Sequence, residues 1–158
     1  MDKTGNNYYQ SCRLNAGLTQ EAASEMIGIS VSTIAKIETD ARLPSELVVD
    51  RMADVYHAPM LAWWHLKHHS VLGHHLPDVI QPQSDGDMAL QSILMGDDIC
   101  HANEVIKALL ADGIIALDEY EDLMAYNVMI KRISDRATSI NVYIEGIDKG
   151  AYEYQELR

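Results

Sequence analysis

Residues 19–38 read TQEAASEMIGISVSTIAKIE, and this stretch decides the fold. Two segments with helical spacing of apolar residues lie on either side of Gly28. Thr19 and Ser30 stand where the segments begin, and both are favoured N-cap types because a hydroxyl oxygen accepts a hydrogen bond from a first-turn N–H. Glycine readily takes the positive φ that follows many helices. The stretch therefore predicts two capped helices joined by a tight turn.

The two expected helices can pack closely, because Ala23 and Ser24 are small at the point where they would cross. An apolar side that fixes their angle is supplied by Ile27, Ile29, Ile34 and Ile37. The other face of the second helix is left with Val31, Ser32, Ala35 and Lys36. This arrangement suits a bihelical DNA reader, whose first helix crosses the DNA backbone while the second lies in the major groove.

The stretch resembles the Cro/C1-type helix-turn-helix family, also called Xre-type, to which phage repressors belong. The resemblance extends back to Arg13 and Leu18 and forward through residues 42–44 and the next helix. It implies an all-α chain with a five-helix, phage-repressor-like DNA-binding domain. It also implies a cytoplasmic, sequence-specific double-stranded DNA-binding transcriptional regulator of bacterial or prophage type, acting as a repressor.

The resemblance assigns the DNA-contacting positions of this sequence. Gln20 matches a phosphate and base-flank contact, Thr33 lies close to the backbone, and Arg42 matches a position that meets phosphate. Val31, Ser32 and Lys36 match base-facing positions. The implied DNA-binding set is Gln20, Ser30, Val31, Ser32, Thr33, Lys36 and Arg42. Arg13 and Glu38 match a pair that forms an internal salt bridge.

Two features depart from the family pattern. Asp40 replaces the usual glycine after the recognition helix; it tolerates left-handed φ but brings negative charge near phosphate. The recognition face also lacks Arg, Asn and Gln, which have bidentate base chemistry. Val31 could contact a thymine methyl group and Lys36 a guanine. This is a sparse code, which favours readout of DNA shape as well.

The chain divides into two helix-rich blocks. Five short helices are expected over about residues 6–16, 20–27, 31–39, 45–56 and 59–69, with Gly17 ending the first and Pro59 opening the last. Residues 74–87, HHLPDVIQPQSDGD, have a linker composition. We therefore predict a DNA-binding domain over residues 1–76, a linker over 77–87 and a helical hairpin over 88–158.

The predicted hairpin has helices over about residues 88–110 and 117–143, joined at residues 111–113; the short run 140–144 is read as helix. An apolar stripe recurs at three- and four-residue steps on the second helix: Tyr120, Leu123, Asn127, Ile130, Ile133, Ala137 and Ile140. Its partner is either the first block or a second copy, and Asn127 could set the register. We expect a homodimer through these C-terminal helices.

Six histidines crowd into residues 57–75. His65 and His69 are four apart on one helix face, as metal-binding pairs are, and His74 or His75 could add a third ligand. No H-E-x-x-H pattern accompanies them, and the alternative places the histidines, His68 included, in solvent while Leu61, Trp63, Trp64 and Leu66 cap the core. We expect no metal or other cofactor, although the cluster leaves metal binding open.

Composition excludes several classes of protein. The net charge of −12 argues against a non-specific polyanion binder. Residues 1–80 carry 6 Lys/Arg and 9 Asp/Glu, and residues 81–158 carry 6 and 15, so most acidity lies outside the predicted DNA-binding part. Two distant cysteines fit a reducing cytosol, and neither a signal peptide nor a membrane span is expected.

Two other functions compete with DNA-binding regulation. A protein-interaction module on the same fold, such as an antirepressor or an antitoxin-like partner, is favoured by the sparse recognition face and the acidity. An enzyme is disfavoured, because the sequence has no paired catalytic carboxylates, nucleophile elbow or phosphate-binding glycine loop. We expect no catalytic residue.

Overall fold

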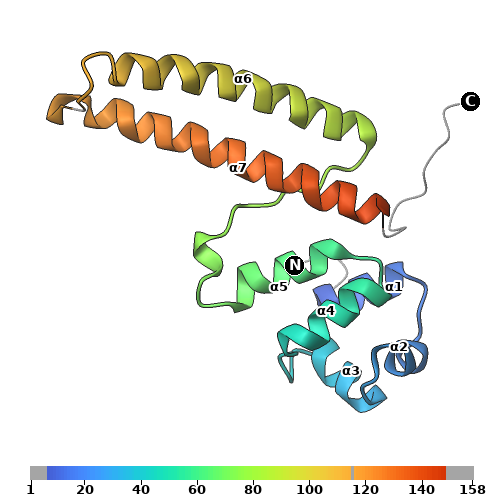
Figure 1. Cartoon of the computed structure of the whole chain (residues 1–158). Helices are drawn as coiled ribbons and strands as arrows, with labels where there is room; N and C mark the ends of the chain where they lie inside the picture. The colour runs from blue at the N-terminus through green and yellow to red at the C-terminus, as the bar shows by residue number, and fades with distance from the viewer. Residues whose placement is uncertain (1–6, 115, 149–158) are drawn as a thin grey trace, which may run out of the picture. The chain divides into compact units, whose positions relative to one another are not determined.

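The computed structural model describes residues 7–114 and 116–148. These residues form α-helices and two 3-10 turns, without a strand among them, which confirms the predicted all-α fold. They divide into two compact units, one formed by residues 7–76 with 145–148 and one by residues 77–144. Figure 1 shows α1 to α5 grouped in the first unit and α6 and α7 side by side in the second.

The first unit holds the five predicted helices: α1 (Tyr8–Asn15), α2 (Gln20–Ile27), α3 (Val31–Glu38), α4 (Glu46–Val55) and α5 (Pro59–His69). The caps are those expected from the sequence. Thr19 Oγ1 accepts from the N–H of Ala22, and Ser30 Oγ accepts from the N–H of Thr33, both at 3.2 Å. Gly28 has a φ of 79°.

The first helix begins later than predicted. Asn7 is its N-cap and accepts from the N–H of Gln10 at 2.9 Å, while Asn6 lies outside the described residues. The other end agrees with the sequence, since Gly17 has a φ of 70° and follows Ala16, the C-cap of the helix. A side-chain cap at Asn7 fixes the start of α1, because it satisfies an N–H that has no partner within the helix.

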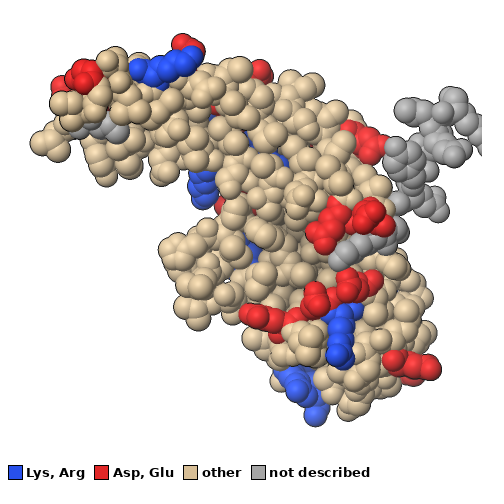
Figure 2. All heavy atoms as spheres, viewed as in Figure 1, with Lys and Arg blue, Asp and Glu red and all other residues tan. Residues whose placement is uncertain are grey.

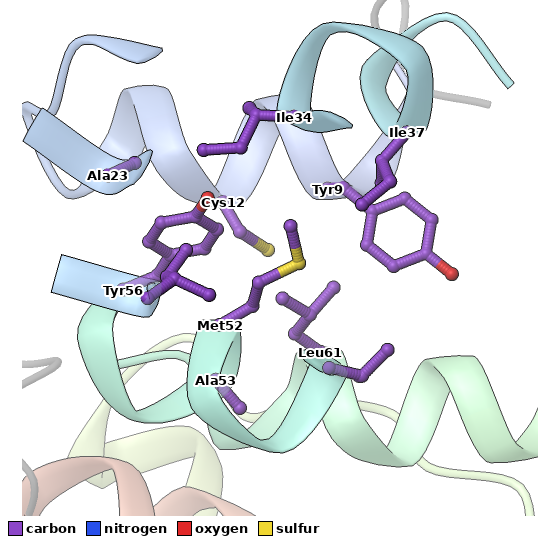
Figure 3. Packing of buried hydrophobic residues seen from close by; sticks show 11 residues of the cluster. Tyr9, Cys12, Ala23, Ile34, Ile37, Met52, Ala53, Tyr56 and Leu61 are labelled. Carbon is purple, nitrogen blue, oxygen red and sulfur yellow. The ribbon is translucent and has the colours of Figure 1, made fainter. Parts of the chain in front are cut away.

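The core of the first unit is built from all five helices, α1 to α5 (Figure 3). Ile34 and Ile37 of α3 are 0% and 1% exposed, and they pack with Met52 of α4 and Leu61 of α5. Each such side chain contributes about 1.5–3 kcal/mol of hydrophobic stabilisation. Burying both isoleucines fixes α3 about its own axis, so the opposite face of this helix must point outward.

His65 lies in the interior, so the prediction that the histidines face solvent is wrong at this position. It is 5% exposed, and its Nδ1 is 2.6 Å from the hydroxyl of Tyr9. Burial, with a smaller effect from Asp40, raises the pKa of Tyr9 to about 12. Burial lowers the pKa of His65, the neighbouring His69 lowers it further, and Glu46 opposes both. The Tyr9 hydroxyl therefore stays protonated and forms its hydrogen bond with a neutral imidazole.

This buried pair makes the first unit sensitive to mild acid. The pKa of His65 is lower in the fold than the ordinary 6.5, so the unfolded chain takes up the proton first. Stability is complete above about pH 6.5 and falls as the pH drops below that value. We expect the free energy of unfolding to decrease from pH 7.5 to 5.5, with a limiting slope of about 1.4 kcal/mol per pH unit for one proton.

Urea unfolding followed by tryptophan fluorescence measures this slope in the first unit, because both tryptophans, Trp63 and Trp64, lie on α5. His65→Gln should flatten the pH dependence, whatever it does to stability at pH 7.5. His101→Gln removes an exposed histidine of the second unit and serves as the control. An unchanged slope in His65→Gln would contradict the assignment.

The second unit is an antiparallel hairpin of α6 (Asp85–Leu109) and α7 (Tyr120–Asp148). The first unit ends in the 3-10 turn η1 (Gly73–His75), and η2 (Leu117–Glu119) precedes α7. The first hairpin helix starts three residues earlier than predicted, because Ser84 caps it by accepting from the N–H of Asp87 at 3.2 Å. Residues 140–144 are helical, as predicted.

A charged cluster ties the two long helices together. Asp98 of α6 bonds Arg132 Nη2 at 2.8 Å and lies 3.4 Å from Arg136 Nε on α7. The segment before α6 also reaches α7, since the N–H of Ile80 donates to Ser139 Oγ at 3.0 Å. These polar contacts join α7 to α6 and to the segment before it, and they help to fix how the two helices are rotated.

The predicted apolar stripe does not form a single buried face. Leu123, Ile133 and Ile140 are half-buried, whereas the other four members are exposed: Tyr120, Asn127, Ile130 and Ala137. The reason is geometric, because three- and four-residue steps fit more than one line along a long helix. The line that faces α6 passes through Met129 and Arg136 instead.

Candidate nucleic-acid interface

The turn between α2 and α3 is built from backbone hydrogen bonds. The N–H groups of Gly28 and Ile29 both donate to the carbonyl of Ser24, at 3.0 and 3.2 Å. This is the bond pattern of a helix end closed by a left-handed glycine. Arg51 of α4 adds a contact to the carbonyl of Ile27 at 3.4 Å. The geometry holds α3 at a set angle to α2.

Four residues of α3 share its outward face. Ser32 and Lys36 are exposed and one helical turn apart, and Val31 and Ala35 are half-buried beside them. The opposite face is buried in the core, as described above. The outward face therefore offers the methyl groups of Val31, the hydroxyl of Ser32 and the exposed ammonium group of Lys36. These are the groups that the sequence predicted for base contacts.

Three hydroxyl groups gather at the start of α3. Ser30 Oγ lies 3.0 Å from Ser32 Oγ and 2.8 Å from Thr33 Oγ1. They surround the helix N-terminus, where unpaired N–H groups and the helix dipole favour an anion. Three of the sequence-predicted residues are thus brought together at one helix end.

Arg42 joins this group from the loop after α3. A hollow of about 390 Å³ lies between the start of α3 and this loop, and Ser30, Thr33 and Arg42 all line it. The loop is folded back by the N–H groups of Ala41 and Arg42, which donate to the carbonyl of Lys36 at 2.9 and 3.1 Å. Lys36 itself does not line the hollow.

The hollow also includes a residue that sequence reasoning missed. Ser45 lines it and is exposed, and it is the N-cap of α4 without a side-chain cap hydrogen bond. Its hydroxyl is therefore not used in capping. The signal was present in the sequence, because Ser45 follows Pro44 directly at a helix start, but capping was the role that this pattern indicated.

Gln20 lies apart from this group and is bound within the protein. Its Nε2 donates to Glu38 Oε2 at 2.8 Å, and the side chain is half-buried. The same carboxylate accepts from Arg13 Nε at 2.6 Å and from Arg13 Nη2 at 2.9 Å. The Arg13–Glu38 pair expected from the family resemblance is thus present, and Gln20 is its third member.

Asp40 occupies the left-handed conformation that its position demands, with a φ of 57°. Its Oδ1 accepts from Asn7 Nδ2 at 3.0 Å, and the same amide donates to the carbonyl of Ile37 at 2.6 Å. The carboxylate that replaces the expected glycine is therefore turned toward α1. Asn7 holds the end of α3 and the start of α1 together.

Charge is unevenly distributed around this site. Lys36 and Arg42 are exposed, and Figure 2 shows Lys and Arg atoms toward the end of the first unit that holds α2 and α3. Acidic side chains of α4, Asp50 and Asp54, are exposed on a different helix. Positive charge near α3 favours approach of a polyanion at this end.

Residues 10–62 match the protein family described as Helix-turn-helix. This part of the chain is a helix-turn-helix domain of the Cro/C1 type. The match covers α2, the Gly28 turn and α3, and it runs from within α1 into α5. Such a domain supports a DNA-binding regulator. No curated protein and no solved structure matches the chain.

The remaining sequence predictions concern metals and membranes. Across residues 7–114 and 116–148, no three His, Cys, Asp or Glu side chains come together in a way that could hold a metal ion. His65 and His69 do lie close, with ring centroids 5.2 Å apart. In the same part of the chain, every helix is too short or too polar to span a bilayer.

Proposed function

We propose that the chain is a sequence-specific repressor of transcription that binds double-stranded DNA with α3 in the major groove. The observation that carries the proposal is the outward face of α3, where Ser32 and Lys36 are exposed on a helix whose other face is locked in the core. The major groove is about 12 Å wide and admits one α-helix. A protein seated there blocks access to the same DNA.

Base recognition falls to the outward face of α3. Lys36 can donate to the O6 and N7 acceptors of guanine, Val31 can contact a thymine methyl group, and Ser32 can donate or accept. Only one of these side chains is charged, so the base code is sparse. Sequence-dependent width and stiffness of the groove supply part of the specificity.

Backbone recognition falls to the hydroxyl group cluster and the hollow beside it. Ser30, Thr33 and Arg42 line this hollow, and a phosphate placed there meets hydroxyl donors, a guanidinium and a helix N-terminus. Gln20 keeps one amide hydrogen for a second phosphate, since only one Nε2–H is taken by Glu38.

The functional form in this proposal is a homodimer through α6 and α7. One head covers one half-site, and paired heads read two half-sites about one helical turn apart. The second unit is acidic, with 4 Lys/Arg against 12 Asp/Glu in residues 77–144. Repulsion from phosphate keeps it off the duplex and leaves contact to the heads.

Lys36→Ala is expected to weaken binding to the operator by about 1–3 kcal/mol, a 5- to 150-fold loss, because a base or phosphate contact is removed. The operator is first obtained by selecting duplexes that the full-length protein binds from a random pool. Gel-shift titration at a stated salt concentration then measures the affinity of each variant.

Lys107→Ala is the matched control, since it removes the same charge from an exposed side chain of α6 whose ion-pair partner is Glu104. It should bind the selected duplex as the wild type does. If Lys36→Ala binds equally well while its tryptophan fluorescence shows a folded head, α3 is not the reading helix.

A protein-interaction module is the second candidate function, and the charge balance is the observation that favours it. The chain has a net charge of −12, and Lys36 is the only charged residue on the outward face of α3. In that case the random-pool selection yields no enriched duplex, and the outward face of α3 binds a protein instead.

A further inference from the structure

The hairpin carries an uncharged face that its own seam does not cover. The face is defined by six residues that helix geometry places on one side of the hairpin: Ile99 and Ile106 of α6, Leu110 at its C-cap, and Leu123, Ile130 and Ala137 of α7. Ile99 and Ile130 are each 41% exposed, and Leu110 is 47% exposed. Large apolar side chains left open in a helical pair indicate that another surface covers them.

The position of this face follows from the ion pair in the seam. Asp98 and Arg136 meet across the hairpin, and Ile99 and Ala137 come one residue after them on their respective helices. In an antiparallel pair of helices, the residue that follows a seam residue points to the same side of the pair on both helices. Residues seven apart keep this orientation with a drift of about 20°, which brings Ile106 and Ile130 onto the same face.

The three cationic residues of α7 are engaged in ion pairs. Arg132 and Arg136 pair with Asp98 of α6, and Lys131 pairs with Asp78 of the segment before α6. The polar residues beside the uncharged face, Asn127 and Ser134, carry no charge.

We propose that this uncharged face binds the same face of a second copy, so that two hairpins form a four-helix bundle. The proposal rests on the dimeric regulator proposed above and names the surface that makes it. Charge determines which surface two copies can share, because residues 77–144 carry 4 Lys/Arg and 12 Asp/Glu. Two such acidic units repel each other unless they meet where charge is absent.

The size of the face fits a stable dimer. The shorter helix has 25 residues, and at 1.5 Å per residue it is about 37 Å long. Two helices side by side are about 20 Å wide. This side of the hairpin, taken along the whole length of α6, therefore offers roughly 700 Å², close to the approximately 800 Å² that each partner buries in a standard interface.

The hairpin buries few large side chains by itself, among them Leu109, Val142 and Tyr143. Of α6, only Ala102 and Leu109 are buried, whereas Ile99 on this helix and Leu110, its C-cap, are exposed on the uncharged face. A helix pair gains stability by burying apolar stripes of at least about 100°. A second hairpin stacked on the uncharged face completes that stripe on α6 and α7 at the same time.

Analytical ultracentrifugation of the full-length chain tests the surface directly. Each variant introduces glutamate at an exposed position: Ile99→Glu, Ile130→Glu and Ala137→Glu lie on the uncharged face, and Ile93→Glu and Val128→Glu lie off it. The controls introduce the same charge at side chains that are more exposed than those of the face. Ile93 and Val128 are 64% and 58% exposed, against 41% for Ile99 and Ile130.

The wild type is expected to sediment as a dimer at micromolar concentration. The three face variants should raise the dimer dissociation constant by about 100-fold or more, since each places like charges opposite each other. The two controls should change it by less than about threefold. Ala137→Glu removes no large apolar side chain, and glutamate is among the good helix formers, so we expect the hairpin to stay folded in this variant.

The outcomes separate the occupants. A monomeric wild type overturns the proposal and assigns the face to another protein or to the first unit. Dimers in all variants, or dissociation in the controls as well, places the interface elsewhere on the chain. Binding of a single half-site duplex, measured in parallel, reports the DNA-reading role independently, so either proposal can fail while the other stands.

Discussion

Arg13→Ala is expected to lower the free energy of unfolding of the first unit by about 3–5 kcal/mol. The side chains of Arg13 and Glu38 are 6% and 3% exposed, and two hydrogen bonds join them at 2.6 and 2.9 Å. Removing the guanidinium leaves a buried carboxylate with Gln20 as its remaining side-chain partner. Without Arg13, the free-energy cost of burying the Glu38 carboxylate is no longer offset by an ion pair.

The converse change is also expected to be costly. Without Glu38, the guanidinium of Arg13 keeps its bond to the carbonyl of Leu18 at 2.6 Å but loses its counter-charge. The hydrogen bond with Glu38, more than any other influence, raises the pKa of Arg13, so the arginine stays charged in the fold. Glu38→Ala should thus resemble Arg13→Ala in its effect on stability.

The double substitution Arg13→Met with Glu38→Leu separates pairing from packing. Replacing both charges by apolar groups of similar volume is often neutral, so much of the lost stability should return. Urea unfolding followed by tryptophan fluorescence gives all three values. Should Arg13→Ala cost no more than about 1 kcal/mol, the pair behaves as an exposed one and its structural role is disproved.

Gln20→Ala belongs to the same network, and this changes the meaning of its effect on DNA binding. A glutamine that only touched phosphate would leave stability unaltered. Here its amide donates to Glu38, so the variant should lose some stability as well as affinity. Comparison of affinity with unfolding free energy for this variant is needed before the residue is assigned to the DNA contact.

The sequence predicted the first unit well because its signals are local. Thr19, Ser30 and Gly28 determine where two helices begin and end within a few residues, and the structure has these caps. Contacts between distant residues left no such signal. The bond of His65 to Tyr9 spans 56 positions and that of Gln20 to Glu38 spans 18. Both side chains were therefore placed at the surface.

The hairpin was predicted in outline and misjudged in rotation. Helical spacing gave two long helices, but steps of three and four residues describe neighbouring lines on one helix equally well. The line through Met129 and Arg136 faces α6, because Arg136 and Arg132 form ion pairs with Asp98 on that helix. An ion pair across the seam cannot be read from the spacing of apolar residues, and it decided which of them stayed exposed.

Dimerisation through the uncharged face should have its largest effect on operator binding. When two heads are linked, the second binds as an intramolecular event at an effective concentration of about millimolar, which raises affinity about 10²- to 10⁴-fold. We expect Ile130→Glu to lower affinity for an operator with two half-sites by this factor. The variant leaves α3 unaltered, so affinity for a single half-site should stay within about twofold of the wild type.

The measurement compares two duplexes and three proteins. Gel shifts with one and with two half-sites are run for the wild type, Ile130→Glu and Val128→Glu, at a protein concentration where the wild type is dimeric. Two half-sites one turn apart should be bound cooperatively by the wild type and by Val128→Glu, and independently by Ile130→Glu. Equal loss on both duplexes would mean that the substitution damages the head. Cooperative binding by a monomeric Ile130→Glu would instead show that the two sites are coupled without α7. The coupling would then come from direct contact between the heads or from the DNA itself.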